Sequence, residues 1–180
     1  MRKFIDIINE AARTRGISNQ GWIDNVFARE DVNQLYLHGS DHSFDSFSEP
    51  DTDIGRLIFS SKLIEPYEHR DHKTTMLQAE YYGRNLYLIK IHFTKRFNPN
   101  PKADPVAAEI FRNAVEGQWD WETKVRYGRF DYQDAHLVVP PAVEAGYDFF
   151  RIYEQAMMGS SHGSAHASMI EIVDRFSSAS

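Results

Sequence analysis

Residues 34–40 form an apolar run that ends on three residues able to take part in binding, His38, Gly39 and Ser40. The run before them has the pattern of a buried strand. Because glycine has no Cβ, the main chain at Gly39 stays open to close approach where the strand ends. A histidine, exposed main-chain amide groups and a hydroxyl therefore meet at one strand end, an arrangement that suits capture of a small planar amide.

Aromatic and acidic residues that could complete such a site occur later in the chain. They are Phe59 in the segment that opens on Gly55, the pair Tyr81 and Tyr82, the turn Gly146-Tyr147-Asp148, and Glu171 in the strand-like segment 169–173. Each also has an ordinary structural interpretation, since aromatics favour cores and polar residues favour the surface. His38 would then be a bonded core histidine, Tyr81 a core aromatic, and Glu171 a solvent-facing strand residue.

In this order the motifs resemble the ADP-ribosyltransferase superfamily. The resemblance is to the branch with a His, an aromatic and a Glu, as in diphtheria-toxin-like and poly(ADP-ribose)-polymerase-like domains, and covers roughly residues 34 to 175. The nearer likeness is to small transferase domains of phage polyvalent proteins and bacterial effectors. The resemblance implies a split β-sandwich with flanking helices, and NAD as co-substrate in the cleft.

The resemblance also implies roles for the cofactor-binding residues. The main chain of Gly39 would hold the nicotinamide amide, the Ser40 hydroxyl would support it, and His38 would bond a ribose hydroxyl. The second motif opens on Gly55 and places Phe59 where the family usually has a tyrosine, which removes a hydroxyl but keeps a ring that can stack. Tyr81 matches the second aromatic, with Tyr82 as the alternative.

The catalytic acid implied by the resemblance is Glu171, with Glu154 as the fallback. A fixed carboxylate stabilises the positive charge that develops on the ribose when the nicotinamide bond breaks. Met169 stands where arginine-specific transferases carry a second acidic residue, so arginine is not favoured as the acceptor. The extensions typical of polymerising enzymes have no evident place in the chain, which favours mono-ADP-ribosylation of a protein.

Composition limits the other function classes. The 180 residues have the length of one domain, include no cysteine, and carry a formal net charge of -6. That charge opposes sequence-independent binding to nucleic acid. No secretory signal and no membrane-spanning run of apolar residues is expected, so the sequence predicts a cytoplasmic protein, in the host cell if it is a phage or effector protein.

The coarse pattern of elements predicts an α+β domain. Helices are expected at 2–15, 73–83 and 104–115, with Asp104 as the cap and Pro105 at the first position, and two helical pieces broken at Pro140-Pro141 over 131–146. Strands are expected at 35–37, 57–59, 86–93, 147–153 and 169–173, and a flexible loop at 159–166. Trp119 and Trp121 should cover a core edge, or else line a ligand groove.

These elements divide the chain into an N-terminal helix and connection at 1–33, a transferase-like domain at 34–175 and a tail at 176–180. Two other function classes stay open. One is a catalytically inactive relative that binds NAD or has a structural role in a phage. The other is a hydrolase or metal enzyme that uses His69, His72 and His92.

Overall fold

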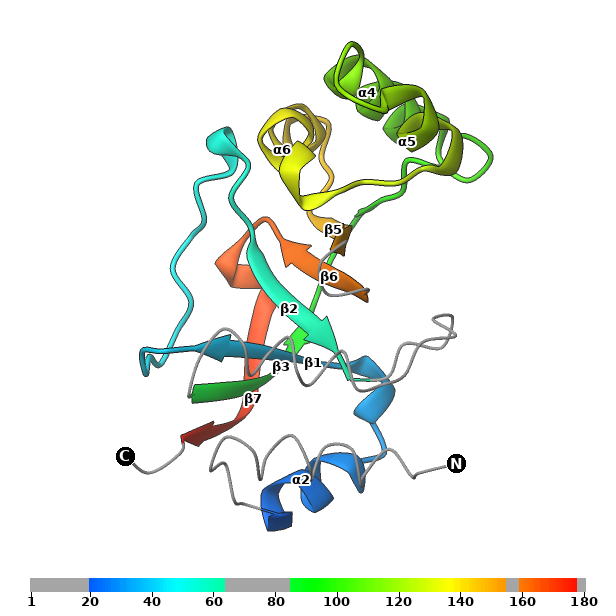
Figure 1. The fold of residues 1–180 in the computed structure, drawn as a ribbon. Helices are drawn as coiled ribbons and strands as arrows, with labels where there is room; N and C mark the ends of the chain where they lie inside the picture. The colour runs from blue at the N-terminus through cyan, green and yellow to red at the C-terminus, as the bar shows by residue number, and fades with distance from the viewer. Residues whose placement is uncertain (1–19, 64–84, 155–158, 178–180) are drawn as a thin grey trace. The chain divides into compact units, whose positions relative to one another are not determined.

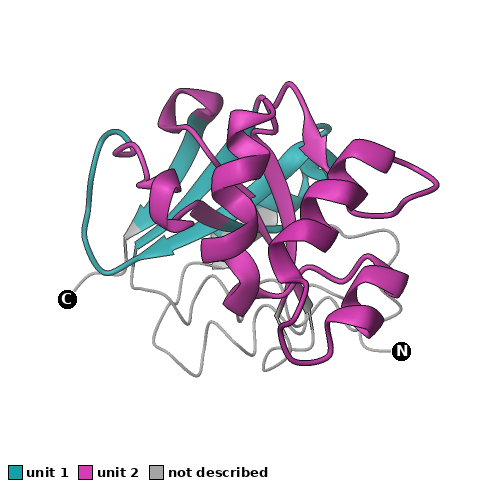
Figure 2. Ribbon diagram, turned by 90° about the horizontal axis from the view of Figure 1, so that it is seen from above, with its two compact units in different colours: residues 1–46, 60–91, 171–180 teal, residues 47–59, 92–170 magenta. Residues whose placement is uncertain are grey.

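A computed structural model describes residues 20–63, 85–154 and 159–177. The chain divides into two compact units, shown in teal and magenta in Figure 2. Unit 1 combines residues 1–46, 60–91 and 171–180, and unit 2 combines residues 47–59 and 92–170. Each unit therefore draws on segments that are distant in sequence, and residues 34–175 contribute to both.

Unit 1 contains helix α2, a 3-10 turn and strands in the order β2-β1-β3-β7. Strand β1 pairs antiparallel with β2 on one side and with β3 on the other. The elements, labelled in part in Figure 1, are α2 (Gln20–Phe27), η1 (Val32–Gln34), β1 (Leu35–Ser40), β2 (Ile58–Lys62), whose last three residues belong to this unit, β3 (Asn85–Ile91) and β7 (Ile170–Ser177).

A leucine-rich cluster forms the core of unit 1. It is explained by alternation, because every second residue of a strand points to the same face. The buried members are Val26, Leu35, Leu37, Leu63, Leu86 and Leu88. At its edge Asp31 accepts hydrogen bonds from Arg29 and lies 2.7 Å from the Lys90 ammonium, and these contacts hold the pKa of the Asp31 carboxyl well below its usual range.

Unit 2 contains most of the helices and a second set of strands. Strand β5 pairs antiparallel with β6 and parallel with β4, and α4 and α6 are neighbours (Figure 1). Its elements are η2 (Thr52–Ile54), β4 (Arg96–Phe97), α4 (Pro105–Val115), α5 (Trp121–Tyr127), η3 (Tyr132–Asp134), α6 (Ala135–Glu144), β5 (Phe149–Glu154), β6 (Gly159–Ser164) and η4 (Ala167–Met169).

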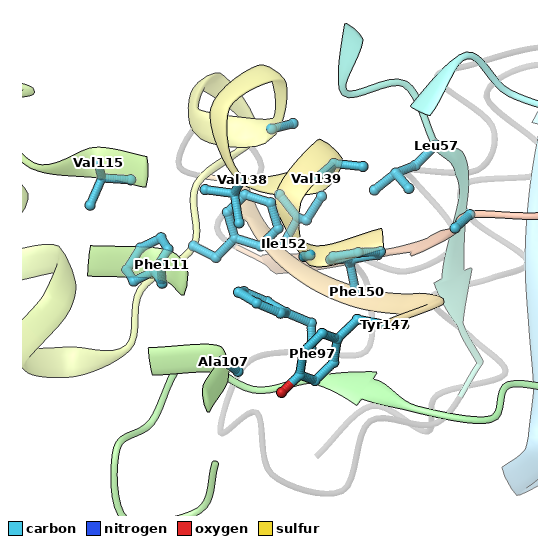
Figure 3. Close-up of a cluster of buried hydrophobic side chains, with 14 residues drawn as sticks. Leu57, Phe97, Ala107, Phe111, Val115, Val138, Val139, Tyr147, Phe150 and Ile152 are labelled. Carbon is cyan, nitrogen blue, oxygen red and sulfur yellow. The ribbon is translucent and has the colours of Figure 1, made fainter. Parts of the chain in front are cut away.

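An aromatic and aliphatic core holds unit 2 together, and most of it is drawn in Figure 3. Phe97, Phe111 and Phe150 are each 2% exposed or less. Tyr147 is also buried, and its hydroxyl donates to Asp104 over 2.8 Å, while the other oxygen of Asp104 caps α4 by accepting from Ala107 N–H. Burial, followed by this hydrogen bond to Asp104, raises the pKa of Tyr147 to about 12.

The α+β class is confirmed, and so are most of the predicted strands. The capped helix at 104–115 is present as α4, with Asp104 as the cap and Pro105 in its first turn. The predicted helices at 2–15 and 73–83 lie outside the described residues. Within the described residues, no helix has the length and apolar character needed to cross a membrane.

The prediction of a flexible loop at 159–166 is wrong, because Gly159–Ser164 forms strand β6. Its small polar composition suggested a loop. In the structure Ser161, His162 and Ser164 are buried, and the Cδ1 atom of Leu57 lies 2.5 Å from the position that a Cβ of Gly163 would occupy. Small residues in this strand permit close packing. The local sequence cannot show whether such residues serve close packing or a flexible loop.

The predicted break at Pro140-Pro141 is also wrong, since α6 runs without interruption through both prolines. Each proline lacks the N–H of one helical hydrogen bond, although its φ is compatible with a helix. Burial of Val138, Val139 and Ala142 in the unit 2 core offsets the two missing bonds. Tertiary packing thus overrides the local signal.

A buried charge cluster links α5 to the start of α6. Lys124, which is 3% exposed, donates to both carboxylate oxygens of Asp134 at 2.8 and 2.9 Å. Its ammonium also lies 3.6 Å from the carboxylate of Asp131, which accepts a hydrogen bond from Arg129. One buried lysine therefore contacts two buried carboxylates, of which Asp131 is also bonded to Arg129.

Replacing Lys124 with methionine should lower the free energy of unfolding by about 3 to 5 kcal/mol, because a buried carboxylate would lose its partner. Chemical denaturation measures the change. Lys102→Met, at an exposed lysine of the same unit, is the control. The double variant Lys124→Met/Asp134→Leu should lose less than the sum of its two single changes, and strict additivity would contradict the pairing.

Candidate functional site

The C-terminal half of β1 carries the predicted cofactor motif in unit 1. His38, Gly39 and Ser40 are half-buried, and they pair with Tyr87, Leu86 and Asn85 of β3. By alternation the side chains of His38 and Ser40 point to the face opposite the leucine-rich cluster. The motif is therefore placed at a strand end, as the sequence predicted.

The main-chain groups of Gly39 point to the side of β1 that pairs with β2, where fewer residues are paired than on the β3 side. Leu63 N–H donates to Leu35 O on the β2 side, and alternate residues direct their main-chain groups to the same side, so those of Gly39 point there too. The pairing with β2 ends at Leu37↔Ser61, whereas that with β3 continues to Ser40↔Asn85. Gly39 thus lies two residues beyond the last pair with β2.

Aromatic rings surround His38 on its face of the sheet. Its imidazole lies 6.0 Å from the ring of Phe44 and 6.2 Å from that of Tyr87, and these two rings stack at 4.2 Å. The Tyr87 hydroxyl accepts from Phe44 N–H and donates to His42 O, which fastens the loop after β1.

A second feature, in unit 2, is a surface pocket of about 730 Å³ that we call the Phe59 pocket. It contains both residues of the second predicted motif, Gly55 and Phe59. The residues that line it are Glu49, Pro50, Asp51, Ile54, Gly55, Arg56, Leu57, Phe59, Tyr132, Gln133, Ala135 and His136. They come from the segment 49–57, which includes η2, from the start of β2, from η3 and from the first turn of α6.

The pocket combines aromatic faces with charges of both signs. The rings of Phe59 and Tyr132 lie 5.4 Å apart at 52°, and Tyr132 is 59% exposed. Glu49 is held by Ala167 N–H at 3.1 Å and lies 3.7 Å from the His166 imidazole. Arg56, by contrast, has no ion pair within the part of the chain that the structure describes, so its guanidinium is available to an anionic group.

Gly55 shapes this pocket by packing. Its φ is 79°, and a Cβ there would overlap the main chain of His136 and lie 2.6 Å from the carbonyl carbon of Ala135. Only a residue without a side chain lets the segment after η2 approach the start of α6 so closely. The glycine predicted to open a cofactor motif therefore has a clear structural role beside the pocket.

The other predicted residues are more dispersed. Glu171 lies on β7 in unit 1 and is exposed. Val173 and Phe176 of the same strand both pack against the leucine-rich cluster, so β7 does not alternate regularly along its length. Glu154 is the last residue of β5 in unit 2, and Tyr81 and Tyr82 lie outside the described residues.

The metal interpretation gains no support from the residues that can be located. His69 and His72 lie outside the described residues, and His92 is exposed. Over residues 20–63, 85–154 and 159–177, no group of three or more His, Cys, Asp or Glu side chains could hold a metal ion.

The sequence selects only Gly55 and Phe59 of the Phe59 pocket, and it misses the aromatic and basic side chains Tyr132, Arg56 and His136. The pattern of residues 131–146 predicts two helical pieces and gives Tyr132 no special role. The contact between the rings of Tyr132 and Phe59 is a tertiary contact, and the local sequence gives no sign of it. Arg56 stands next to Gly55, and this adjacency is the one clue that the sequence offered.

Comparisons with known proteins do not identify a family. No family model matches the chain, and no curated protein matches it. A solved structure described as the crystal structure of an anti-CRISPR protein is similar over 77% of this chain and 94% of its own, with a TM-score of 0.45 and 14% sequence identity. A likeness this weak supports no assignment of fold or function.

Replacing Gly55 with alanine should destabilise the protein by clearly more than the cost of a left-handed backbone, which is about 1 to 3 kcal/mol. The excess comes from the overlap with the first turn of α6. Gly146→Ala is a matched control, because Gly146 has φ 85° and no atom within 4 Å of its would-be Cβ. Equal losses of stability in the two variants, measured by chemical denaturation, would contradict the close packing at Gly55.

Proposed function

We propose that the protein is an NAD-dependent mono-ADP-ribosyltransferase that acts on a protein target, with the split β-sandwich typical of such enzymes. The observation that carries the proposal is the composition of the Phe59 pocket. Gly55 and Phe59, selected by the resemblance, line one pocket together with a second aromatic and two basic side chains, Arg56 and His136. This combination fits a ligand that has both flat rings and phosphates.

The chemistry of the pocket suits a dinucleotide. The faces of Phe59 and Tyr132 can stack on a nicotinamide or adenine ring. The guanidinium of Arg56 can form paired hydrogen bonds with a phosphate. The carboxylates of Glu49 and Asp51 would repel phosphate but accept hydrogen bonds from ribose hydroxyls. A volume of about 730 Å³ lies within the range of small-molecule sites.

The end of β1 supports the same ligand independently. A carboxamide offers one acceptor and two donors in a plane, and the N–H and C=O of Gly39 are complementary to them. These groups point to the edge of β1 beyond its last pair with β2. His38 lies next to Gly39 on the strand, where its imidazole could bond a sugar hydroxyl.

Catalysis would require a carboxylate near the bond between nicotinamide and ribose. When that bond breaks, nicotinamide leaves with the bonding electron pair, and the acceptor atom of the target forms the new bond and loses a proton. A fixed carboxylate lowers the barrier by stabilising the positive charge that develops on the ribose. Glu171 remains the first choice for this role and Glu154 the second.

The second candidate function is NAD binding without transfer. The phenylalanine at position 59, where the family usually has a tyrosine, agrees with this alternative. In that case the protein would act as a binding or structural protein of a phage.

Replacing Phe59 with alanine should weaken NAD binding by about 1 to 3 kcal/mol, the range for the loss of a stacked and partly buried ring. Isothermal titration calorimetry measures the affinity. Tyr127→Ala is the control, because Tyr127 is 72% exposed in the same unit and does not line the pocket. Unchanged affinity in the Phe59 variant would exclude the pocket as the NAD site.

Glu171→Gln should leave NAD affinity nearly intact and reduce transfer by about 100-fold or more, because it removes a charge needed mainly in the transition state. The measurement follows labelled NAD, modified protein and free nicotinamide in a bacterial lysate, with Glu154→Gln in parallel. Loss of activity in the Glu154 variant alone would transfer the role to that residue. A parent protein that binds NAD and neither modifies protein nor releases nicotinamide would support the binding function.

A further inference from the structure

The connection between α4 and α5 exposes an aromatic ring that the structure of unit 2 does not use. Trp119 is 84% exposed, and its ring has no aromatic or hydrogen-bonding partner among the described residues. Trp121, by contrast, packs against the unit 2 core. The expectation that both tryptophans cover a core edge therefore holds for Trp121 and is wrong for Trp119.

The backbone holds Trp119 outward in a defined turn. Trp121 N–H donates to Gln118 O, and Lys124 N–H donates to Asp120 O at the start of α5. Asp120 has φ 60°, a left-handed conformation that no other non-glycine residue adopts in the described part of the chain. The buried contact of Lys124 with Asp134 anchors the helix that follows. The ring is thus presented from a fixed support.

The charged side chains nearest to Trp119 along the chain are all acidic. Glu116, Asp120 and Glu122 lie within three residues of it along the chain, all are exposed, and none forms an ion pair within the described residues. Of the basic side chains on these elements, Lys124 is buried against Asp134, while Arg112 on α4 and Arg126 on α5 are exposed. Arg129, which bonds Asp131, also interacts electrostatically with Asp120. An aromatic face among carboxylates attracts cations, because the ring quadrupole and the negative charges act in the same direction.

We propose that Glu116, Trp119, Asp120 and Glu122, which we call the Trp119 surface, dock a basic segment of a partner protein. An arginine side chain would lie on the face of Trp119 and bond a neighbouring carboxylate. Arginine is favoured over lysine because its flat guanidinium stacks on indole and bonds carboxylates in pairs. The surface is separate from the residues that line the Phe59 pocket, and its function does not depend on NAD.

The test uses the full-length protein and a capped peptide of alternating arginine and glycine, with binding followed by calorimetry at low ionic strength. Trp119→Ala should weaken binding roughly 2- to 30-fold, the range of a cation–π contact. Trp119→Phe should recover part of the loss. Glu122→Gln should also weaken binding, whereas Glu30→Gln, at an exposed carboxylate of unit 1, should not.

Several results would overturn the proposal. Equal affinity of the parent and Trp119→Ala would show that the peptide binds through the net charge of the protein alone. The same holds if Glu30→Gln weakens binding as much as Glu122→Gln. Absence of binding to the arginine peptide, or equal binding of a glutamate-glycine peptide, would also overturn it. Binding to phosphatidylcholine vesicles in place of the peptide would show that Trp119 contacts a lipid surface.

Discussion

The first turn of α6 is fixed by two contacts, and the Phe59 pocket depends on both. From one direction Gly55 packs against the main chain of Ala135 and His136. From another, Lys124 binds the carboxylate of Asp134, the residue just before the helix. The pocket lies where these contacts meet, so its shape is set by main-chain packing and a buried ion pair. Side chains such as Arg56 then project from a framework that has little freedom to shift.

The two units contribute different recognition chemistry to the proposed function. In unit 1 the end of β1 offers main-chain hydrogen bonds and an imidazole, and the core of that unit is rich in leucine. In unit 2 the Phe59 pocket offers aromatic faces and a guanidinium, and the core of that unit is rich in phenylalanine. Each feature is built on the core of its own unit.

Much of the fold could be predicted from local sequence. The apolar run at β3, the strand β1 that carries Gly39, and the cap of α4 all follow from residue types and spacing. The errors have a common physical cause. Strand β6 is made of small polar residues that fit a tight space, and α6 contains prolines whose cost is offset by the core. In both places tertiary packing outweighs local preference.

The candidate site was less accessible to such reasoning. His38, Gly39 and Ser40 were correctly placed at a strand end, and Gly55 and Phe59 share a pocket. The sequence could not show that Tyr132 would face Phe59, because that contact joins residues far apart in the chain. It also suggested no separate role for Gly55, whose need for a bare Cα arises from the neighbouring helix.

The prolines of α6 have a thermodynamic consequence for any ligand of the Phe59 pocket. With two hydrogen bonds missing, α6 has little helical stability of its own and persists only when its buried residues are packed. Ala135 and His136 occupy their places in the pocket only when this packing exists. Binding and the assembly of the unit 2 core are therefore linked equilibria. A compound that occupies the pocket acts as a stabiliser of the whole unit, and thermal unfolding becomes a direct reporter of occupancy.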